Sequence, residues 1–385
     1  MQLRSRTPNI LYLVHDLADP SVHKRVAMLR DGGASVVLAG FCRAEVPGYN
    51  VTRCPAVSLG KTYNGKFAQR VWSVLREVAQ PEKLRTLCAQ ADIVIARNLE
   101  MLALAVRGNQ LDGKKVIYEC LDIHRLLLGT GVAARSLRWL EGWLSRKASA
   151  LITSSPAFTR AYFKPLSKVR LPVMMLENKL YRMNAAAPAP GPAGTRMAGP
   201  PWRIGWFGAI RCRKSLQILS ELVKQSDGRI EVVIRGRPAY DQFKDFDRSV
   251  NEVPGLTFHG PYKNPNDLAA IYGDVHFTWA VDMFEEGQNS SWLLPNRIYE
   301  GGAYGAVPIA DARVETGRFL DALGIGVIMP GIRLDLLKGF FANLTPQQYR
   351  FMAQAVEKVP QEVWSFGAED CKRLVEELKA LPVAA

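Results

Sequence analysis

Residues 294–310 read LPNRIYEGGAYGAVPIA, and the fold class is most clearly indicated here. Pro295 stands where a helix would begin, a position that proline favours because its missing N–H is not needed there. Gly305 then ends the helix, and the apolar run 306–310 that follows is typical of a strand buried on both faces. A helix that leads directly into a buried strand is the repeating unit of a parallel α/β sheet.

The same alternation extends over both halves of the 385-residue chain. Short apolar runs predict strands, and helical spacing of apolar residues, as in 66–78, predicts helices between them. The strands expected in the first half are 9–14, 34–39, 92–96, 114–119, 149–153 and 172–176. Those expected in the second half are 203–207, 231–235, 256–259, 275–280, 306–310 and 325–329, with helices at 214–225, 265–272, 295–304, 345–358 and 367–380. We therefore expect two Rossmann-like, doubly wound parallel sheets that face each other across an interdomain cleft.

A Pro/Gly-rich segment, NAAAPAPGPAGTRMAGPP at 184–201, separates the two halves. Its proline and glycine content precludes a stable helix or central strand, so we interpret it as a linker, with a surface loop inside one domain as the alternative. The predicted organisation is an N-terminal domain over 1–183, this linker, a C-terminal domain over 202–360, and a last helix within 361–385 that can pack back on the N-terminal domain.

Charge is distributed unevenly along the chain. The 50 Lys and Arg against 36 Asp and Glu give a net charge of +14, and a hydrophobic content of 48% excludes wholesale disorder. Residues 1–200 hold 29 basic and 13 acidic side chains, whereas residues 201–385 hold 21 and 23. The positive excess therefore belongs to the first half, where nucleic acid, an anionic membrane face or a phosphorylated substrate would suit it.

Cysteine spacing and hydropathy indicate the compartment. The six cysteines are widely spaced and form no CxxC motif, so we expect neither a zinc site nor a disulfide framework, and a reducing cytoplasm is the simplest setting. No stretch approaches the roughly 20 apolar residues of a membrane span, and the N-terminus lacks a signal-peptide pattern. We expect a protein that is soluble or that lies on a membrane without crossing it.

Basic residues stand at the start of the helix after the first strand of the second half. Gly208 allows the backbone to approach a ligand, and Arg211 and Lys214 follow at the helix N-terminus, where free N–H groups already favour an anion. Basic side chains oppose the helix dipole there, so a diphosphate would explain them; a turn with solvated cations is the alternative. Neither a GxGxxG nor a P-loop motif is present.

A second polar cluster lies within the opening stretch. Asn296, Arg297 and Glu300 follow Pro295, and Asn296 and Glu300 share one face of the helix. Two consecutive glycines at 301–302 cost roughly 1 kcal/mol each in a helix interior. They are explained if the backbone must approach something closely.

At 294–310 the chain resembles the retaining group 1 (family 4-like) glycosyltransferases, which have the GT-B architecture. The resemblance implies a hexosyltransferase whose C-terminal domain binds a nucleotide-sugar donor, without a metal or another cofactor. By that resemblance Glu300 would bind the ribose, while Arg211 and Lys214 would neutralise the donor diphosphate. Gly208, Asn296 and Arg297 complete the implied donor-binding set.

The chain departs from this family at one point. The family has two Glu with seven residues between them, but Trp292 stands eight positions before Glu300. Either Glu286 supplies the first carboxylate across a longer loop, where the family uses it on the donor sugar, or Asn296 and Arg297 replace it. Glu286 is therefore a candidate catalytic residue.

Candidates in the first half follow the expected strands, where parallel sheets bind ligands. Asp19 can cap a helix that starts at Pro20. The candidates for the cleft and the acceptor are Asp16, Lys24, Arg25, Arg97 and Asn98. Lys24 and Arg25 could contact an anionic acceptor or be exposed, and Asn98 could instead be a helix N-cap. Asp122 and His124 are candidate catalytic contacts to sugar hydroxyls or the acceptor, with a structural hydrogen bond as the alternative for the histidine.

The helical segment 134–147 indicates a membrane surface. Leu137, Leu140 and Leu144 form one stripe along this helix. If the leucines face the core, the stripe on the opposite side points outward, and it consists of Arg135, Trp139, Trp143 and Arg146. Exposed Trp with Arg is typical of a headgroup-level interface, whereas a helix packed on two sides is the alternative.

Together these features favour sugar transfer to a polyprenyl-diphosphate-linked acceptor in surface or exopolysaccharide assembly. We expect a cytoplasmic protein at the periphery of the inner membrane face, bound to anionic lipid. A non-catalytic GT-B-like partner protein is the first alternative. A nucleic-acid-binding protein is the second, but the basic residues are spread over many elements and no known nucleic-acid module is present, so no nucleic-acid partner is expected.

Overall fold

The computed structural model describes residues 6–42, 54–61, 82–108, 114–182 and 197–384. The helix expected at 66–78 and most of the Pro/Gly-rich segment lie outside these residues. The chain forms two compact units: Met1–Glu177 together with Gly367–Ala385, and Asn178–Phe366.

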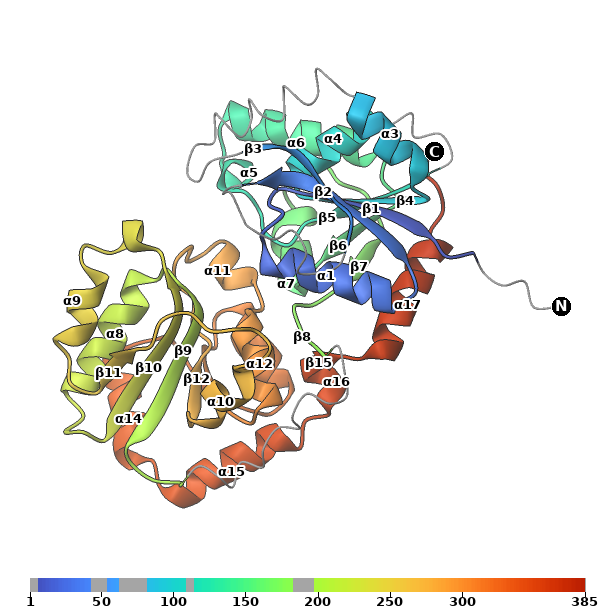
Figure 1. Cartoon of the computed structure of the whole chain (residues 1–385). Coiled ribbons are helices and arrows are strands. Elements are labelled where there is room, and N and C mark those ends of the chain that lie inside the picture. The colour runs from blue at the N-terminus through green and yellow to red at the C-terminus, as the bar shows by residue number, and fades with distance from the viewer. Residues whose placement is uncertain (1–5, 43–53, 62–81, 109–113, 183–196, 385) are drawn as a thin grey trace. The chain divides into compact units, whose positions relative to one another are not determined.

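The first unit is built on a sheet whose described strands number seven, all parallel, in the order β3-β2-β1-β4-β5-β6-β7 (Figure 1). The strands are β1 (Asn9–Val14), β2 (Ser35–Cys42), β3 (Ala56–Lys61), β4 (Ile93–Arg97), β5 (Lys115–Glu119), β6 (Ala150–Thr153) and β7 (Val173–Met175). The helices are α1 (Pro20–Asp31), α3 (Glu82–Gln90), α4 (Leu99–Gly108), α5 (Arg125–Leu128), α6 (Val132–Ser145), α7 (Pro156–Phe158) with the π-helical turn Thr159–Phe163, and α17 (Ala368–Ala380).

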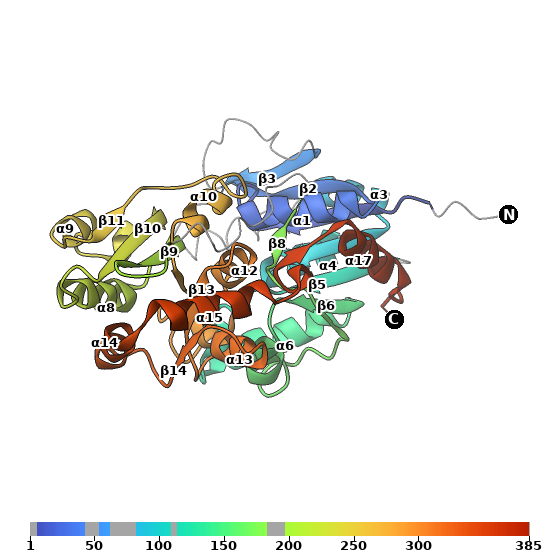
Figure 2. The same cartoon turned by 90° about the horizontal axis from the view of Figure 1, so that it is seen from below.

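Helices cover both faces of this sheet, which explains why its central strands are continuously apolar. In β1 every residue after Asn9 is buried. Helix α1 starts at Pro20 because the Asp19 carboxylate accepts a hydrogen bond from the Ser21 N–H (2.8 Å), so the predicted cap is confirmed. Helix α17 lies beside α1 (Figures 1 and 2), where a Cβ on Gly32 would stand 2.3 Å from the carbonyl oxygen of Cys371.

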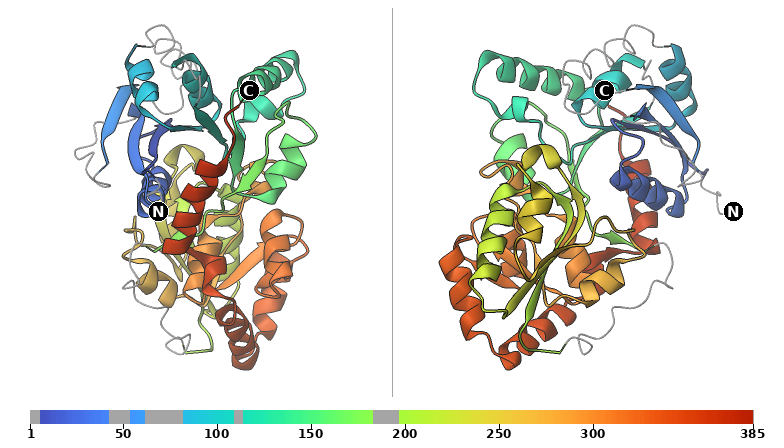
Figure 3. Two further views of the ribbon diagram at one scale, coloured as in Figure 1. Left: turned by 90° about the vertical axis from the view of Figure 1, so that its right-hand side faces the viewer. Right: turned by 60° about the vertical axis from the view of Figure 1, so that its left-hand side comes forward.

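The second unit contains a six-stranded parallel sheet over its described residues, in the order β11-β10-β9-β12-β13-β14. Figures 1 and 2 together label these six strands, and Figure 3 shows the same unit, coloured yellow-green to red, from two further sides. Its strands are β9 (Trp202–Ile210), β10 (Ile230–Pro238), β11 (Leu256–Phe258), β12 (Phe277–Trp279), β13 (Val307–Asp311) and β14 (Val327–Met329), and β8 (Leu180–Tyr181) pairs separately with β15 (Ser365–Phe366). The helices are α8 (Arg213–Lys224), the 3-10 turn Tyr240–Gln242, α9 (Phe246–Asn251), α10 (Leu268–Gly273), α11 (Asn289–Trp292), α12 (Asn296–Ala303), α13 (Glu315–Ala322), α14 (Leu334–Asn343), α15 (Pro346–Glu357) and α16 (Gln361–Trp364).

The strand order reverses beside β9, and this position matters for function. The connection through α8 leads from β9 to β10, whereas the connection through α12 leads in the opposite direction, from β12 to β13. Right-handed crossovers in opposite directions place their helices on opposite faces of the sheet. The carboxyl ends of β9 and β12 therefore stand at the point where such sheets bind ligands.

The predicted fold class is confirmed: both halves are doubly wound parallel sheets, and each predicted strand is present. Strands β3, β8 and β15 were not predicted. The last helix starts at Ala368, because residues Gln361–Trp364 form the separate short helix α16 in the second unit.

Candidate functional site

Basic side chains lie where the chain leaves the carboxyl end of β9 and enters α8. Gly208 has a φ of +107°, which favours glycine, and no heavy atom of the described residues lies within 4 Å of the place of its missing Cβ. The Cys212 sulfur accepts a hydrogen bond from the Ser215 N–H (3.3 Å) and caps the helix. Arg211 precedes this cap and Lys214 follows it, so both predicted cations stand at the helix N-terminus.

Arg211 and Arg297 converge on one buried carboxylate, that of Asp282. The Arg211 guanidinium lies 3.3 Å from Asp282 Oδ2 and over the Phe284 ring, 4.8 Å from its centroid. Arg297, on α12, lies 4.0 Å from the same oxygen. The Arg297 side chain is almost fully buried, and its Nη1 has no hydrogen-bond partner among the described residues. A buried guanidinium with an unused donor is a strong candidate for contact with an anionic ligand.

Asp282 was missed by the sequence analysis. Its Oδ1 accepts hydrogen bonds from the Phe284 N–H and the Ser290 hydroxyl, both at 2.9 Å, which leaves Oδ2 to the two guanidinium groups. Burial alone would raise the pKa of Asp282, but the charges of Arg297 and Arg211 and the hydrogen bonds hold that pKa below its ordinary value. Asp282 could have been recognised from its position in the sequence, because it lies three residues beyond the end of β12, where parallel sheets bind ligands.

Lys214 and Glu286 form an ion pair between α8 and the loop that precedes α11. Both side chains are exposed. Of the two alternatives for the missing first carboxylate, Glu286 is thus joined to Lys214, one of the predicted diphosphate cations. In the other alternative, Asn296 is an exposed residue at the first position of α12 and Arg297 pairs with Asp282.

Glu300 is buried on α12 and held by residues that the sequence did not indicate. Its Oε1 accepts a hydrogen bond from Asn264 Nδ2 (2.7 Å), and its Oε2 accepts one from the Tyr272 hydroxyl (3.0 Å). The two glycines that follow it let α12 pack on protein. A Cβ on Gly301 would stand 2.7 Å from Thr278, and one on Gly302 would stand 2.6 Å from the Trp364 ring.

In the first unit, the predicted Arg25 and Arg97 are counter-ions of a buried carboxylate. Arg25 Nε lies 2.9 Å from Glu119 Oε1, Arg97 Nη1 donates to the Tyr12 hydroxyl (3.3 Å), and Tyr12 donates to Glu119. Burial alone would raise the pKa of Glu119, but the charges of Arg25 and Arg97 hold that pKa below its ordinary value. The expectation that Arg25 could be exposed was wrong. The Arg25 side chain is buried, because it forms an ion pair with the buried Glu119 carboxylate.

The other first-unit candidates lie near the carboxyl ends of the strands. Asn98 has a φ of +73° and its Nδ2 lies 3.4 Å from His15 Nδ1, while Asp16 accepts from the Ala18 N–H (3.0 Å). His124 caps α5, its Nδ1 accepting from the Leu126 N–H at 3.3 Å, which is the structural alternative considered above. Asp122 is exposed and Lys24, on α1, is half-buried.

Helix α6 turns its tryptophans outward. Trp139 is 64% and Trp143 is 48% exposed, and Arg135 and Arg146 are also exposed, so the alternative of a helix packed on two sides is wrong. The predicted leucine stripe is wrong in one position, because Leu140 is exposed.

The buried face of α6 centres on Glu141, which the sequence did not single out. The Glu141 carboxyl accepts hydrogen bonds from Tyr118 (3.0 Å), Tyr162 (2.7 Å) and Ser167 (2.7 Å). These three hydroxyl groups explain why a carboxyl, rather than an apolar side chain, can occupy the core at this position.

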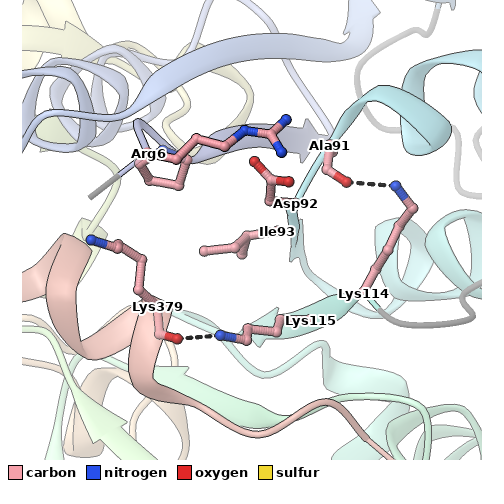
Figure 4. Close-up of a pocket in the computed structure, with 8 residues that line it drawn as sticks. Arg6, Ala91, Asp92, Ile93, Lys114, Lys115 and Lys379 are labelled. Atoms are coloured by element: carbon pink, nitrogen blue, oxygen red, sulfur yellow. Dashed lines mark hydrogen bonds between the residues drawn. The ribbon is translucent and has the colours of Figure 1, made fainter. Parts of the chain in front are cut away.

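A cavity of about 380 Å³ lies in the first unit at the amino ends of β1, β4 and β5 (Figure 4). Its charged lining residues are Arg6, Asp92, Lys114, Lys115 and Lys379. Lys114 Nζ donates to the Ala89 and Ala91 carbonyls (2.7 and 2.6 Å) at the end of α3, and Lys115 donates to the Lys379 carbonyl at the end of α17. These lysines stabilise helix ends, so we place the candidate site at the carboxyl edges of the sheets instead.

The described residues contain no group of three or more His, Cys, Asp or Glu side chains that could hold a metal ion. All six cysteines are buried free thiols. Each described helix is too short or too polar to cross a lipid bilayer.

Comparison with known proteins gives one relative of nearly full length, whereas no family model matches. The chain is 46% identical over 380 residues to the succinoglycan biosynthesis protein ExoL of Rhizobium meliloti (strain 1021), covering 98% of this chain and 94% of that protein. Among solved structures it resembles HepE of Anabaena in complex with UDP (TM-score 0.70, 12% identity, 97% of this chain and 99% of that chain). It also resembles sucrose-phosphate synthase from Thermosynechococcus elongatus (TM-score 0.67, 14% identity, 97% and 100%). Likeness at this identity shows the fold, which is GT-B.

Proposed function

The chain belongs to the family of the succinoglycan biosynthesis protein ExoL, and from that premise we propose that it is a glycosyltransferase. It would move a hexose from a nucleotide-sugar donor to an acceptor during assembly of an extracellular or surface polysaccharide. The HepE structures, which contain UDP, UDP-glucose, or UDP and glucose, support a donor of this chemical class.

The observation that carries the proposal is that Arg211 and Arg297 converge on Asp282 beyond the end of β12, while Lys214 stands in the first turn of the helix that Arg211 precedes. When the glycosidic C–O bond of the donor breaks, negative charge grows on the departing diphosphate. Two guanidinium groups and one ammonium group would offset that charge, so the proposal includes no metal. Arg297 Nη1 finds no hydrogen-bond partner within the described part of the chain, and this supports a ligand here, because a buried donor without a partner is costly.

Glu300 would bind the ribose of the donor. Asn264 and Tyr272 fix the orientation of its carboxyl group, whose oxygens accept hydrogen bonds and so suit the hydroxyl groups of a ribose. Glu286, linked to Lys214, would act near the donor sugar. Contacts of Asp122 and His124 with the acceptor, and retention of the anomeric configuration, rest on the family resemblance alone.

We further propose a polyprenyl-diphosphate-linked acceptor and a site at the periphery of the inner membrane face. The outward stripe on α6 supports this, because Trp139 and Trp143 can enter the headgroup region while Arg135 and Arg146 meet anionic lipid. The basic first half of the chain suits the same anionic surface.

The proposal is tested by offering purified protein a panel of nucleotide sugars and measuring nucleoside diphosphate release, with and without a lipid-diphosphate acceptor. We expect one donor to be consumed, faster with acceptor, and Glu300→Gln to lose most of this turnover while remaining folded. A protein that binds no nucleotide sugar contradicts the proposal, and one that binds donors without ever turning them over favours the non-catalytic alternative.

A further inference from the structure

The loop that follows β12 fixes one oxygen of the Asp282 carboxylate and leaves the other to two arginines. Asp282 Oδ1 accepts hydrogen bonds from the Phe284 N–H and the Ser290 hydroxyl, both at 2.9 Å. The Ser290 hydroxyl in turn accepts a hydrogen bond from the Glu285 N–H (2.8 Å), so α11 and the loop hold each other in place. The orientation of Oδ2 is therefore set by a network of local hydrogen bonds.

Asp282 is the counter-ion of both arginines. Its Oδ2 lies 3.3 Å from Arg211 Nη2 and 4.0 Å from Arg297 Nη2. Among the residues that the structure describes, no other Asp or Glu forms an ion pair with either guanidinium. Burial would raise the pKa of Asp282, but the charges of Arg297 and Arg211 hold that pKa below its ordinary value, so the carboxylate is ionised at neutral pH.

The two arginines depend on this counter-ion to different degrees. The Arg297 side chain is 10% exposed, and a buried guanidinium without a counter-ion is costly. The Arg211 side chain is 37% exposed, so water can screen its charge, and its guanidinium also lies over the Phe284 ring. Loss of the Asp282 charge would therefore act chiefly through Arg297.

A bound diphosphate would change this balance. Its negative charge is a second counter-ion for both guanidinium groups, and groups that are already held in place need no reorganisation when it arrives. Asp282 then has two opposite effects. It keeps the guanidinium donors in position, and its own charge repels the diphosphate.

We propose that Asp282 is a positioning residue of the donor site, which fixes Arg211 and Arg297 for the diphosphate and is their counter-ion until the diphosphate replaces it in that role. The inference rests on the proposed function, because it takes the diphosphate position from it. It adds that the charge of Asp282 supports turnover and weakens the binding of the nucleoside diphosphate, the product that has to leave after each transfer.

The first part of the test measures stability without ligand. Asp282→Asn keeps the size of the side chain and the Oδ1 acceptor but removes the charge, so the thermal unfolding midpoint should fall by about 5 °C or more. In the double variant Asp282→Asn/Arg297→Gln no buried charge of this pair is left without its partner, and about half of that loss or more should be regained. Asp274→Asn is the matched control, because Asp274 lies three residues before β12 as Asp282 lies three residues after it. Asp274 forms an exposed pair with Arg203 (2.7 Å), so this substitution should shift the midpoint by less than about 2 °C.

The second part measures binding and turnover. UDP and GDP are titrated into each variant, with uridine and guanosine as ligands that lack phosphate, and kcat is measured with the donor that the wild type consumes. We expect Asp282→Asn to bind the nucleoside diphosphate about threefold tighter or more, to bind the nucleoside as the wild type does, and to lose about tenfold or more in kcat. A merely structural role of Asp282 would weaken the binding of both ligands and slow turnover together.

Each outcome decides the inference. Asp282→Asn that binds the diphosphate no tighter than the wild type, or turns over as fast, overturns it, and so does a double variant that regains no stability. If Asp282→Asn does not fold, a folded double variant supports the inference and an unfolded one overturns it. A wild type that binds no nucleoside diphosphate and consumes no nucleotide sugar overturns the proposed function and this inference with it.

Discussion

Two buried glutamates of the first unit illustrate how a neighbour's charge decides what burial does to a carboxyl group. Glu119 has two guanidinium partners, so its pKa is lowered and its contribution to stability is lost as the pH falls through that lowered value. Glu141 accepts hydrogen bonds from three hydroxyl groups, and burial raises its pKa despite them. Ionisation of Glu141 therefore opposes folding, and the unit loses stability as the pH rises from the ordinary Glu range through the raised pKa.

The first prediction concerns that pH dependence. Glu141→Gln keeps the shape but cannot ionise, so the variant should gain stability relative to the wild type between about pH 4.5 and pH 7, where glutamates normally carry charge. The measurement is amide hydrogen exchange of β5 and β6 at both pH values. Glu369→Gln, at an exposed position of α17, is the matched control and should follow the wild type. If Glu141→Gln and the wild type change in parallel with pH, the raised pKa is refuted.

At the scale of elements, α12 brings the donor-site residues together because its glycines allow close packing. Gly301 meets Thr278 of β12 and Gly302 meets Trp364 of α16, so the helix lies directly on its neighbours. This packing places Arg297 and Glu300 near the carboxyl ends of β9 and β12. Larger residues at either glycine would push the helix and its functional side chains away from the sheet.

The second prediction tests this packing. Gly302→Ala should destabilise the second unit by roughly 1–3 kcal/mol, because the new methyl group overlaps the Trp364 ring. Gly339→Ala is the matched control. Gly339 lies in α14, where no atom in the part of the chain that the structure describes comes within 4 Å of its Cβ position, so this substitution should stabilise by about 0.5–1 kcal/mol. Urea denaturation followed by tryptophan fluorescence measures both, and equal effects of the two substitutions would contradict the packing account.

The elements also show what could be predicted from sequence. Strands such as β1 and β9 contain long apolar runs, at 10–14 and 204–210, and were predicted because local pattern alone indicates them. Strand β3 (AVSLGK) and the two-residue β8 and β15 carry too little apolar pattern. Arg211, Arg297 and Glu300 were found as candidates from spacing and family resemblance. Asp282, Asn264 and Tyr272 were missed because their roles depend on partners about 15 to 70 residues away, which only the folded chain brings together.

At the scale of the whole molecule, the uneven charge is the feature most directly tied to partners. The first 200 residues carry 29 basic against 13 acidic side chains, and α6 adds exposed tryptophans. Positive charge attracts an anionic bilayer over several ångströms, whereas tryptophan contributes once it reaches the interface. Both contributions should therefore be needed for retention on a membrane.

The third prediction follows from these separate contributions of positive charge and tryptophan. The double variant Trp139→Ala/Trp143→Ala should lower retention on phosphatidylglycerol vesicles by about tenfold and leave nucleotide binding unchanged. Cosedimentation at low and high salt measures it, because added salt should weaken the remaining electrostatic attraction. Phe351→Ala removes an exposed aromatic of the second unit and is the control. Retention that does not change in the double variant rules out α6 as the contact.

Calorimetric titration measures whether the carboxyl edge of the sheet in the second unit binds the diphosphate of a nucleotide-sugar donor, as proposed. UDP, GDP and the corresponding nucleotide sugars are titrated into the wild type, Arg211→Ala and Arg213→Ala. Arg213 is the control: it is a neighbouring cation whose guanidinium donates hydrogen bonds to the Gln242 carbonyl. We predict that the wild type binds one of these nucleotides, that Arg211→Ala weakens binding by roughly 10- to 100-fold through the loss of a charge-assisted hydrogen bond, and that Arg213→Ala binds nearly as the wild type does. Equal losses in both variants, or no binding by the wild type, would contradict the account.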